Sequence, residues 1–386
     1  MNKKLVAAAL GLAFAAPVFA DASNVTLYGR IHQGLEYNSS KTDGLGTTTS
    51  TQPTIVDQSS RLGVRGVEDL GGGLSAIFAY EFGVDTDNVA SGAAGAAGPL
   101  STRHAYLGMK GSFGTVVVGS QDGGNDSQAP LYNQASAYIF NVNNNAGQLT
   151  VVGSGATNDE VILRNQRVSN AIGYAGNIAG VRISARHVLA GTDQGSGALT
   201  AVNPAQNPAA FENGQRQTSV SADYTLGALT FGAGYERRDG TDGYTNAQNA
   251  LAVTGAVKSQ AQIGASYNFG VAQVGGLFAQ QKYYGGRDSD NQYAISTLVP
   301  LASNYGLQAM YAMSENGKQL NGALSQAAGA QDVDNKQFQV SAYYDFSKRT
   351  RSYVGYNRTT RESTSATNAL VETKDNSIVL GLRHNF

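Results

Sequence analysis

Four histidines are the side chains best suited to acid–base or metal chemistry, and they are scattered along the chain as His32, His104, His187 and His384. A hydrolytic triad or a zinc site needs a histidine close to a nucleophile, a carboxylate or further ligands. No such pairing is visible near these four positions. Cysteine is absent, which removes disulfides, reactive thiols and thiolate metal sites. The pattern therefore favours neither an enzyme nor a metalloprotein.

Two acidic segments match a calcium loop only in part. Residues 85–88 and 288–291 carry oxygen ligands at alternate positions, but they lack the glycine and the distal glutamate of such a loop. Gly71-Gly72-Gly73 is not followed by a Lys-Ser/Thr pair, so it fits a tight turn between strands better than a phosphate cradle. We therefore expect no bound metal and no cofactor.

Arginines on alternating segments are the remaining chemical signal. In residues 24–39 the odd positions are largely apolar, whereas the even positions, Arg30 among them, are polar. Arg61 and Arg65 likewise share one face, opposite Leu62 and Val64. Arginines gathered on one face of a sheet act on ions through their electric field. Their function thus depends on the wall that the strands build.

The same alternation of apolar and polar residues runs through the whole chain and predicts antiparallel strands. Short, glycine-rich connections alternate with long ones, of which residues 121–166 form the longest. We count about sixteen strands, about seven short turns and about eight long loops, the pattern of a transmembrane β-barrel with short periplasmic turns and long extracellular loops. Further apolar sets lie within residues 74–82, 220–226, 229–235, 263–269, 305–313, 338–346 and 378–386.

Residues 1–20 have the pattern of a secretory signal peptide. Lys3 and Lys4 precede an apolar run, and Val18-Phe19-Ala20 forms an A-x-A-like cleavage site. The run is too short for a spanning helix, and no later segment matches it. We therefore expect export, cleavage after Ala20, and one barrel domain over residues 21–386.

Composition agrees with an exported β-sheet in lipid. The chain has 48 glycines, 20 tyrosines and 13 phenylalanines but no tryptophan, and its 27 basic and 28 acidic residues nearly cancel. This balance does not favour nucleic-acid binding. In a barrel the apolar set faces lipid, aromatic residues near strand ends mark the interfaces, and the polar set lines an aqueous lumen. The alternative is a secreted soluble all-β protein whose apolar face packs inward.

Six segments carry a family resemblance: residues 25–30, 60–71, 103–109, 113–119, 167–174 and 381–386. They resemble the general-diffusion porins of Gram-negative bacteria, particularly those of β-proteobacteria, and the resemblance covers essentially the whole chain after residue 20. It implies an outer-membrane homotrimer of sixteen-stranded barrels for ions and small hydrophilic solutes. It also implies that the barrel assembly machinery recognises the C-terminal aromatic residue, here Phe386.

In such porins, arginines on the barrel wall face acidic groups on a third long loop that folds into the lumen. Residues 121–166 occupy the place of that loop. The resemblance assigns Arg30, Arg61, Arg103 and Arg167 to the wall. At Arg103 the alternation itself is ambiguous, because Ala105 shares its parity while His104 takes the other.

The acidic side of the predicted constriction departs from the family. The loop lacks the commoner Pro-Glu-Phe-Gly-like tip and offers only Asp122, Asp126, Asp159 and Glu160 at its two ends. With Arg65 added to the wall, we expect a weakly anion-selective general pore. A saccharide-selective channel is the alternative, but it needs lumen aromatics, and most Tyr and Phe fall on the apolar parity.

Overall fold

The computed structural model describes ten stretches of the chain, and all regular structure in them is β-strand in one antiparallel sheet. Within these stretches no helix is long and apolar enough to cross a membrane. The predicted signal peptide and, beyond Gln121, the predicted constriction loop lie outside them. The described residues are 24–43, 47–50, 52–86, 100–121, 168–189, 216–239, 257–283, 289–316, 333–364 and 370–386.

Most strands are eight to sixteen residues long, enough to cross a bilayer at a tilt. They are β1 (Asn24–Thr42), β2 (Thr47–Ser50), β3 (Thr54–Asp57), β4 (Arg61–Gly71), β5 (Leu74–Val84), β6 (Leu100–Gly111), β7 (Gly114–Gln121), β8 (Val168–Ile178), β9 (Val181–Val188), β10 (Arg216–Leu226), β11 (Leu229–Asp239), β12 (Val257–Asn268), β13 (Gln273–Tyr283), β14 (Asp290–Pro300), β15 (Tyr305–Asn316), β16 (Val333–Asp345), β17 (Thr350–Thr364) and β18 (Leu370–Asn385).

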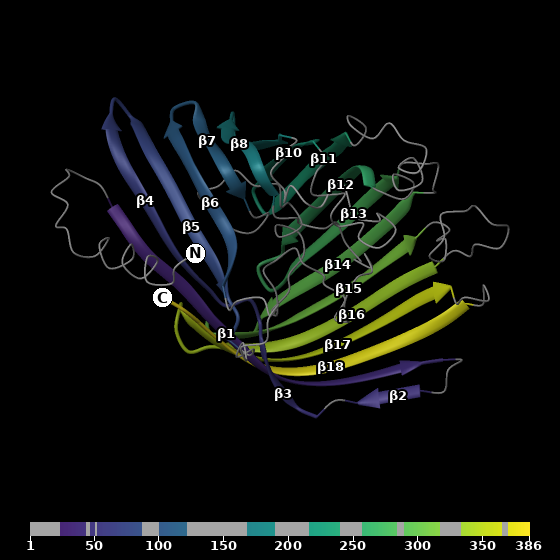
Figure 1. Ribbon diagram of the computed structural model, residues 1–386. Helices are drawn as coiled ribbons and strands as arrows, with labels where there is room; N and C mark the ends of the chain where they lie inside the picture. The colour runs from purple at the N-terminus through teal and green to yellow at the C-terminus, as the bar shows by residue number, and fades with distance from the viewer. Residues whose placement is uncertain are drawn as a thin grey trace, which may run out of the picture.

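The strands β2, β3 and β4 together form one interrupted barrel strand. β2 pairs with residues 39–42 of β1, β3 with residues 33–36, and β4 with residues 24–30. The eighteen strands therefore make a sixteen-stranded barrel, which confirms the predicted number. The segment that the sequence pattern treated as a long loop, residues 40–58, contains β2 and β3. Figure 1 shows both strands extending from the barrel along β1.

The first and last strands close the barrel. β1 and β18 pair from Arg30 opposite Asn385 to Thr42 opposite Thr373. Gly29 and Phe386 add two backbone hydrogen bonds of 3.1 Å, one in each direction. In Figure 1, β1 in purple and β18 in yellow lie side by side. Closure leaves no unpaired edge along this seam, as a sheet in lipid requires.

Short turns gather at one end of the barrel, and the predicted turn at Gly71-Gly72-Gly73 is among them. Its three residues have φ angles of 83°, 62° and 79°, a left-handed conformation that glycine adopts without a steric penalty. The longer connections lie at the opposite end of the strands. By the pattern of outer-membrane barrels, the short turns mark the periplasmic end.

The two faces of the wall have opposite polarity. Outward apolar side chains stay exposed, for example Leu107, Ile263 and Leu380, with exposed fractions of 58–60%. Inward positions carry buried amides and hydroxyls. A soluble β-protein would bury its apolar face instead, so this polarity fits a wall between lipid and an aqueous interior. Among the inward residues are Gln121, Gln217, Ser219, Gln260, Gln292, Ser296, Gln337 and Ser341.

One part of the inner wall is apolar. Ile77, Ala79, Tyr106 and Val117 form a buried cluster on β5, β6 and β7, and Val67 of β4 packs against it. Their inward direction follows from the register, since Ala79 and Ile77 alternate along β5 with the exposed Phe78 and Tyr80. The cluster lies between the middle of the barrel and the periplasmic turns.

Candidate functional site: a charged inner wall

The register of β1 and β4 brings two predicted wall arginines together. Arg30 lies directly opposite Arg61, and both face the interior. On its other side Arg30 lies opposite Asn385, and its Nε donates a 2.9 Å hydrogen bond to the Asn385 Oδ1. The amide thus orients the guanidinium, while closure of the barrel places it beside a second positive charge.

A β-bulge resolves the ambiguity at Arg103. Glu81 of β5 lies opposite His104, and the next residue, Phe82, lies opposite Thr102, so Arg103 is the extra residue. Because a bulge shifts the alternation by one position, both Arg103 and His104 face inward. Their exposed fractions are 6% and 2%. In a regular strand, neighbouring side chains point to opposite faces. The alternation of residues alone could therefore not predict that Arg103 and His104 both face inward.

Glu81 is the acidic partner of these basic residues. The Arg103 Nε donates to Glu81 Oε1 at 2.7 Å, and the Arg61 Nη1 lies 3.7 Å from the same oxygen. The His104 Nε2 lies 3.9 Å from it. The predicted carboxylates all lay on the loop, and Glu81 was not among them. Its inward parity on β5 was the available signal, but Ile77 and Ala79 made that face look apolar.

The cluster extends onto the last strand. Arg30 lies within electrostatic range of Arg61, Arg103, Arg383 and Glu81. Arg383 lies in β18 directly opposite His32, and on its other side it lies opposite Arg351 of β17. Arg383 was not among the predicted residues, although its odd position between the exposed Leu382 and His384 indicated an inward side chain. Arg61 and Arg103 thus lie beside Glu81, whereas Arg30 and Arg383 extend the row of arginines onto β1 and β18, where Asp345 lies within electrostatic range of Arg383.

Arg65 lies closer to the periplasmic turns than Arg61 on the same face of β4. Its guanidinium lies 5.0 Å from the centre of the Tyr28 ring, a cation–π contact. Arg65 also lies opposite Ala79 of the apolar inner cluster, so both side chains share the inner face. The remaining predicted residues, Arg167, Asp122, Asp126, Asp159 and Glu160, lie outside the described part of the chain.

A second buried ion cluster lies on the β9–β12 side of the wall. Glu236 accepts hydrogen bonds from Arg186 Nη2 at 3.1 Å, Arg238 Nε at 2.9 Å and Gln260 Nε2 at 3.1 Å. Glu236 follows the first residue of β11 by seven positions, as Glu81 follows the first residue of β5. The two clusters thus lie at a similar depth in the barrel wall. The second cluster was not predicted, because only acids on the loop were among the candidate residues.

Comparison with known proteins decides the family. The family model described as Gram-negative porin matches residues 6–364. The chain belongs to the Gram-negative porin family. Its relatives are outer-membrane channels rather than enzymes, and the closed barrel with a polar interior is the form that such channels take. We therefore refer to the chain below as the porin.

Two relatives extend over most of the porin. Outer membrane porin protein 32 of Delftia acidovorans is 27% identical over 92% of this chain and 88% of its own. An outer membrane porin protein of Bordetella pertussis is 26% identical over the full length of both. The match to major outer membrane protein P.IB of Neisseria gonorrhoeae, at 38% identity, spans only 32% of that protein.

Solved structures share the fold. An anion-selective porin from Comamonas acidovorans superposes with a TM-score of 0.66 at 21% identity, over 94% of this chain and all of that one. OmpF of Salmonella typhi, in complex with daunomycin, gives a TM-score of 0.62 at 14% identity, over 96% of this chain and 99% of that one. At these identities the likeness concerns the fold alone.

Proposed function

We propose that the porin forms an open, water-filled pore for ions and small hydrophilic solutes, with a weak preference for anions. The observation that carries this proposal is the gathering of arginines on the described part of the inner wall. Arg61 and Arg103 lie beside Glu81, and Arg30 and Arg383 follow on β1 and β18 within electrostatic range of one another. On the β9–β12 side of the wall, Arg186 and Arg238 both bond to Glu236.

Local charge outweighs net charge in such a pore. Charged groups beyond about 8 Å are largely screened at physiological salt, so the near-neutral total of the chain has little influence inside the lumen. Walls of low dielectric constant focus the field of the nearest charges onto the ion path. The inner acid Glu36 lies on β1, six positions beyond Arg30 toward the extracellular end, and so opposes the arginines mainly there.

The rest of the inner wall suits general diffusion. Its buried side chains are mostly neutral glutamines, serines and asparagines, which hydrogen-bond to water and to many solutes alike. A saccharide-selective channel would need a stripe of inward aromatics. Among the described residues, most large aromatic side chains, such as Phe78, Tyr235 and Tyr311, are exposed on the outer face. The outer face thereby suits contact with membrane lipid.

We also propose that residues 121–166 fold into the lumen and set its size limit. Support comes from the apolar inner cluster of Ile77, Ala79, Tyr106 and Val117, with exposed fractions of 0–5%. A water-filled lumen would leave an apolar patch wet, so a patch this well buried needs apolar partners. The loop offers Leu131, Tyr132, Tyr138, Ile139 and Phe140.

Trimer formation, removal of residues 1–20 and recognition by the assembly machinery are further proposals from family resemblance. Phe386 is the residue that we propose as the assembly signal. Its support is its place directly after the closing strand β18, where the residue is 42% exposed and its backbone is bonded to Gly29.

Planar-bilayer recording tests the open pore and its loop together. Conductance of the purified porin should rise in proportion to the salt concentration, as in a wide aqueous channel. Deleting residues 129–150 should increase conductance and admit larger solutes while the barrel still forms. A folded barrel without conductance would contradict the pore, and an unchanged conductance after the deletion would contradict the constriction.

A further inference from the structure

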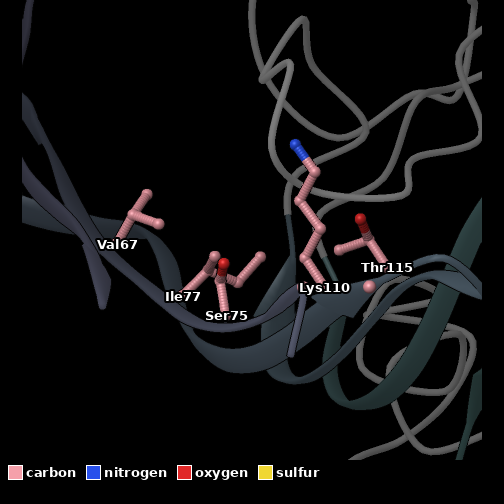
Figure 2. Close-up of a pocket in the computed structure, with 7 residues that line it drawn as sticks. Val67, Ser75, Ile77, Lys110 and Thr115 are labelled. Carbon is pink, nitrogen blue, oxygen red and sulfur yellow. The ribbon is translucent and has the colours of Figure 1, made fainter. Parts of the chain in front are cut away.

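The inner wall contains a second basic feature near the periplasmic turns. A half-open cavity of about 220 Å³ lies at the ends of β4, β5, β6 and β7. Figure 2 shows the labelled lining side chains on one side of the sheet, with Lys110 pointing away from the strands. Besides glycines at the turns, the lining residues are Val67, Ser75, Ile77, Lys110 and Thr115.

The register explains why these five side chains meet. Lys110 of β6 lies opposite Ser75 of β5 and, on its other side, opposite Thr115 of β7. Val67 lies opposite Ile77 on the neighbouring pair of strands. All five share the inward parity of Glu81 and Tyr106, so the cavity opens into the barrel. It therefore has one polar side and one apolar side.

The lining chemistry selects an anion with an apolar part. The Lys110 ammonium offers three donors, and the hydroxyls of Ser75 and Thr115 can each donate one more. None of the lining residues that the structure describes carries a carboxylate. The nearest acid in register is Asp69, opposite Ser75, and its Oδ1 already accepts a 2.9 Å hydrogen bond from the Gly71 amide. Val67 and Ile77 continue into the buried apolar cluster and offer no hydrogen bonds.

We propose that this cavity is an exit subsite for small monocarboxylates with a short hydrocarbon tail. Lys110, Ser75 and Thr115 hold the carboxylate, and the half-buried Val67, where the apolar cluster reaches the pocket, contacts the tail. A volume of about 220 Å³ suits a small organic anion. The subsite rests on the proposed function, because solutes reach it through the lumen.

The exit subsite is separate from the arginine cluster. Lys110 follows Arg103 by seven residues on β6, roughly 23 Å along an extended strand. This distance exceeds the screening length of about 8 Å at physiological salt. Lys110 therefore has little influence on the ion preference set by the arginines, and the two sites can be tested independently.

Binding at the exit subsite can be measured from the duration of single-channel block by a bound anion. Hexanoate added on the periplasmic side should block wild-type channels for longer than acetate, which has no tail to bury. Lys110→Gln should weaken the apparent binding of hexanoate by up to about fivefold, the upper value for an exposed ion pair. The matched control is Lys348→Gln, an exposed lysine on the periplasmic turn between β16 and β17 that does not line the cavity, and it should behave as wild type.

A second variant separates the two halves of the subsite. Val67→Thr, at the half-buried edge of the apolar cluster, should remove the advantage of hexanoate over acetate and leave acetate block unchanged. Equal block by the two anions in wild type, or no difference between Lys110→Gln and Lys348→Gln, would overturn the proposal.

Saturation-transfer NMR with hexanoate and the folded barrel in detergent measures the same binding without any current. A barrel that does not conduct, or that prefers cations, but still binds hexanoate through Lys110 would contradict the proposed function and leave the subsite standing. Absence of binding in an anion-preferring pore would overturn the subsite alone.

Discussion

Glu81 has two effects on the arginine cluster: it holds the arginines together and it reduces their positive charge. It accepts the 2.7 Å hydrogen bond from Arg103 and lies 3.7 Å from Arg61, so it holds two like charges close together on the wall. It also cancels one positive charge where ions pass. A carboxylate in this position therefore stabilises the arginine cluster and limits its field at the same time.

Replacing Glu81 should separate these two effects. Glu81→Gln removes one negative charge, and a unit charge about 8 Å from an ion in water is worth about 0.5 kcal/mol, or roughly twofold in ion occupancy. We expect a stronger anion preference, measured by zero-current potentials in a KCl gradient. The variant should also unfold more easily, by about 1–3 kcal/mol, because charge-assisted hydrogen bonds are lost.

The matched control for this change is Glu362→Gln. Along β17 the odd positions, such as Asn357 and Thr359, are buried on the inner face, and the even positions, such as Val354, face outward. Glu362 is at an even position and therefore lies outside the lumen. Its loss should leave the zero-current potential unchanged. Equal shifts in both variants, or a weaker anion preference in Glu81→Gln, would remove Glu81 from the ion path.

At the scale of elements, the bulge in β6 decides which side chains line the pore. Because Arg103 is the extra residue, deleting it restores a regular ladder between Glu81 opposite His104 and Phe82 opposite Thr102. We expect the deletion variant to fold and to lose anion preference as Arg103→Gln does. Deleting Leu107, in the regular part of β6, should instead shift residues 100–106 by one position. Their inward side chains would then face lipid and their outward ones the lumen, which should prevent assembly.

Heat-modified migration in gels measures folding of both deletion variants. Failure of the Arg103 deletion to fold, with normal folding of Arg103→Gln, would show that the bulge itself is needed. Normal folding of the Leu107 deletion would contradict the importance of register on this strand.

The closing seam depends on a second element, the contact of Gly29 with Phe386. A Cβ at Gly29 would overlap the Phe386 ring and lie 2.7 Å from the Arg61 carbonyl oxygen, whereas a Cβ at Gly276 would meet only the Ala294 carbonyl oxygen at 3.7 Å. Gly29→Ala should therefore slow or prevent closure, and Gly276→Ala, on another outward strand position, should not. Equal folding yields of the two variants would contradict this account.

The alternation of residues was sufficient to predict the barrel, its strand number and the polarity of its faces. It also placed Arg30, Arg61 and Arg65 on the inner face. The alternation could not place Arg103, because a bulge changes which side chains of the strand face inward and has no clear signal in the sequence. Glu81 and Glu236 were missed because pairing across strands depends on register, which a single strand does not reveal.

For the whole molecule, ion preference and solute binding arise at different depths of one wall. The arginine cluster and the Glu236 cluster lie near the middle of the strands, and the Lys110 cavity lies at the periplasmic turns. Between and around them the inner wall is mainly neutral and polar. Such an arrangement admits many hydrophilic solutes while it biases the passage of charged ones.

The zero-current potential of the wild-type porin in a KCl gradient tests this account most directly. The predicted result is a chloride permeability above that of potassium, which moves toward equality in the double variant Arg61→Ala, Arg103→Ala. The control Arg358→Ala, an exposed arginine on the outer face of β17 opposite Phe338, should keep the wild-type value. Cation preference in the wild type, or the same potential in the double variant and the wild type, would contradict it.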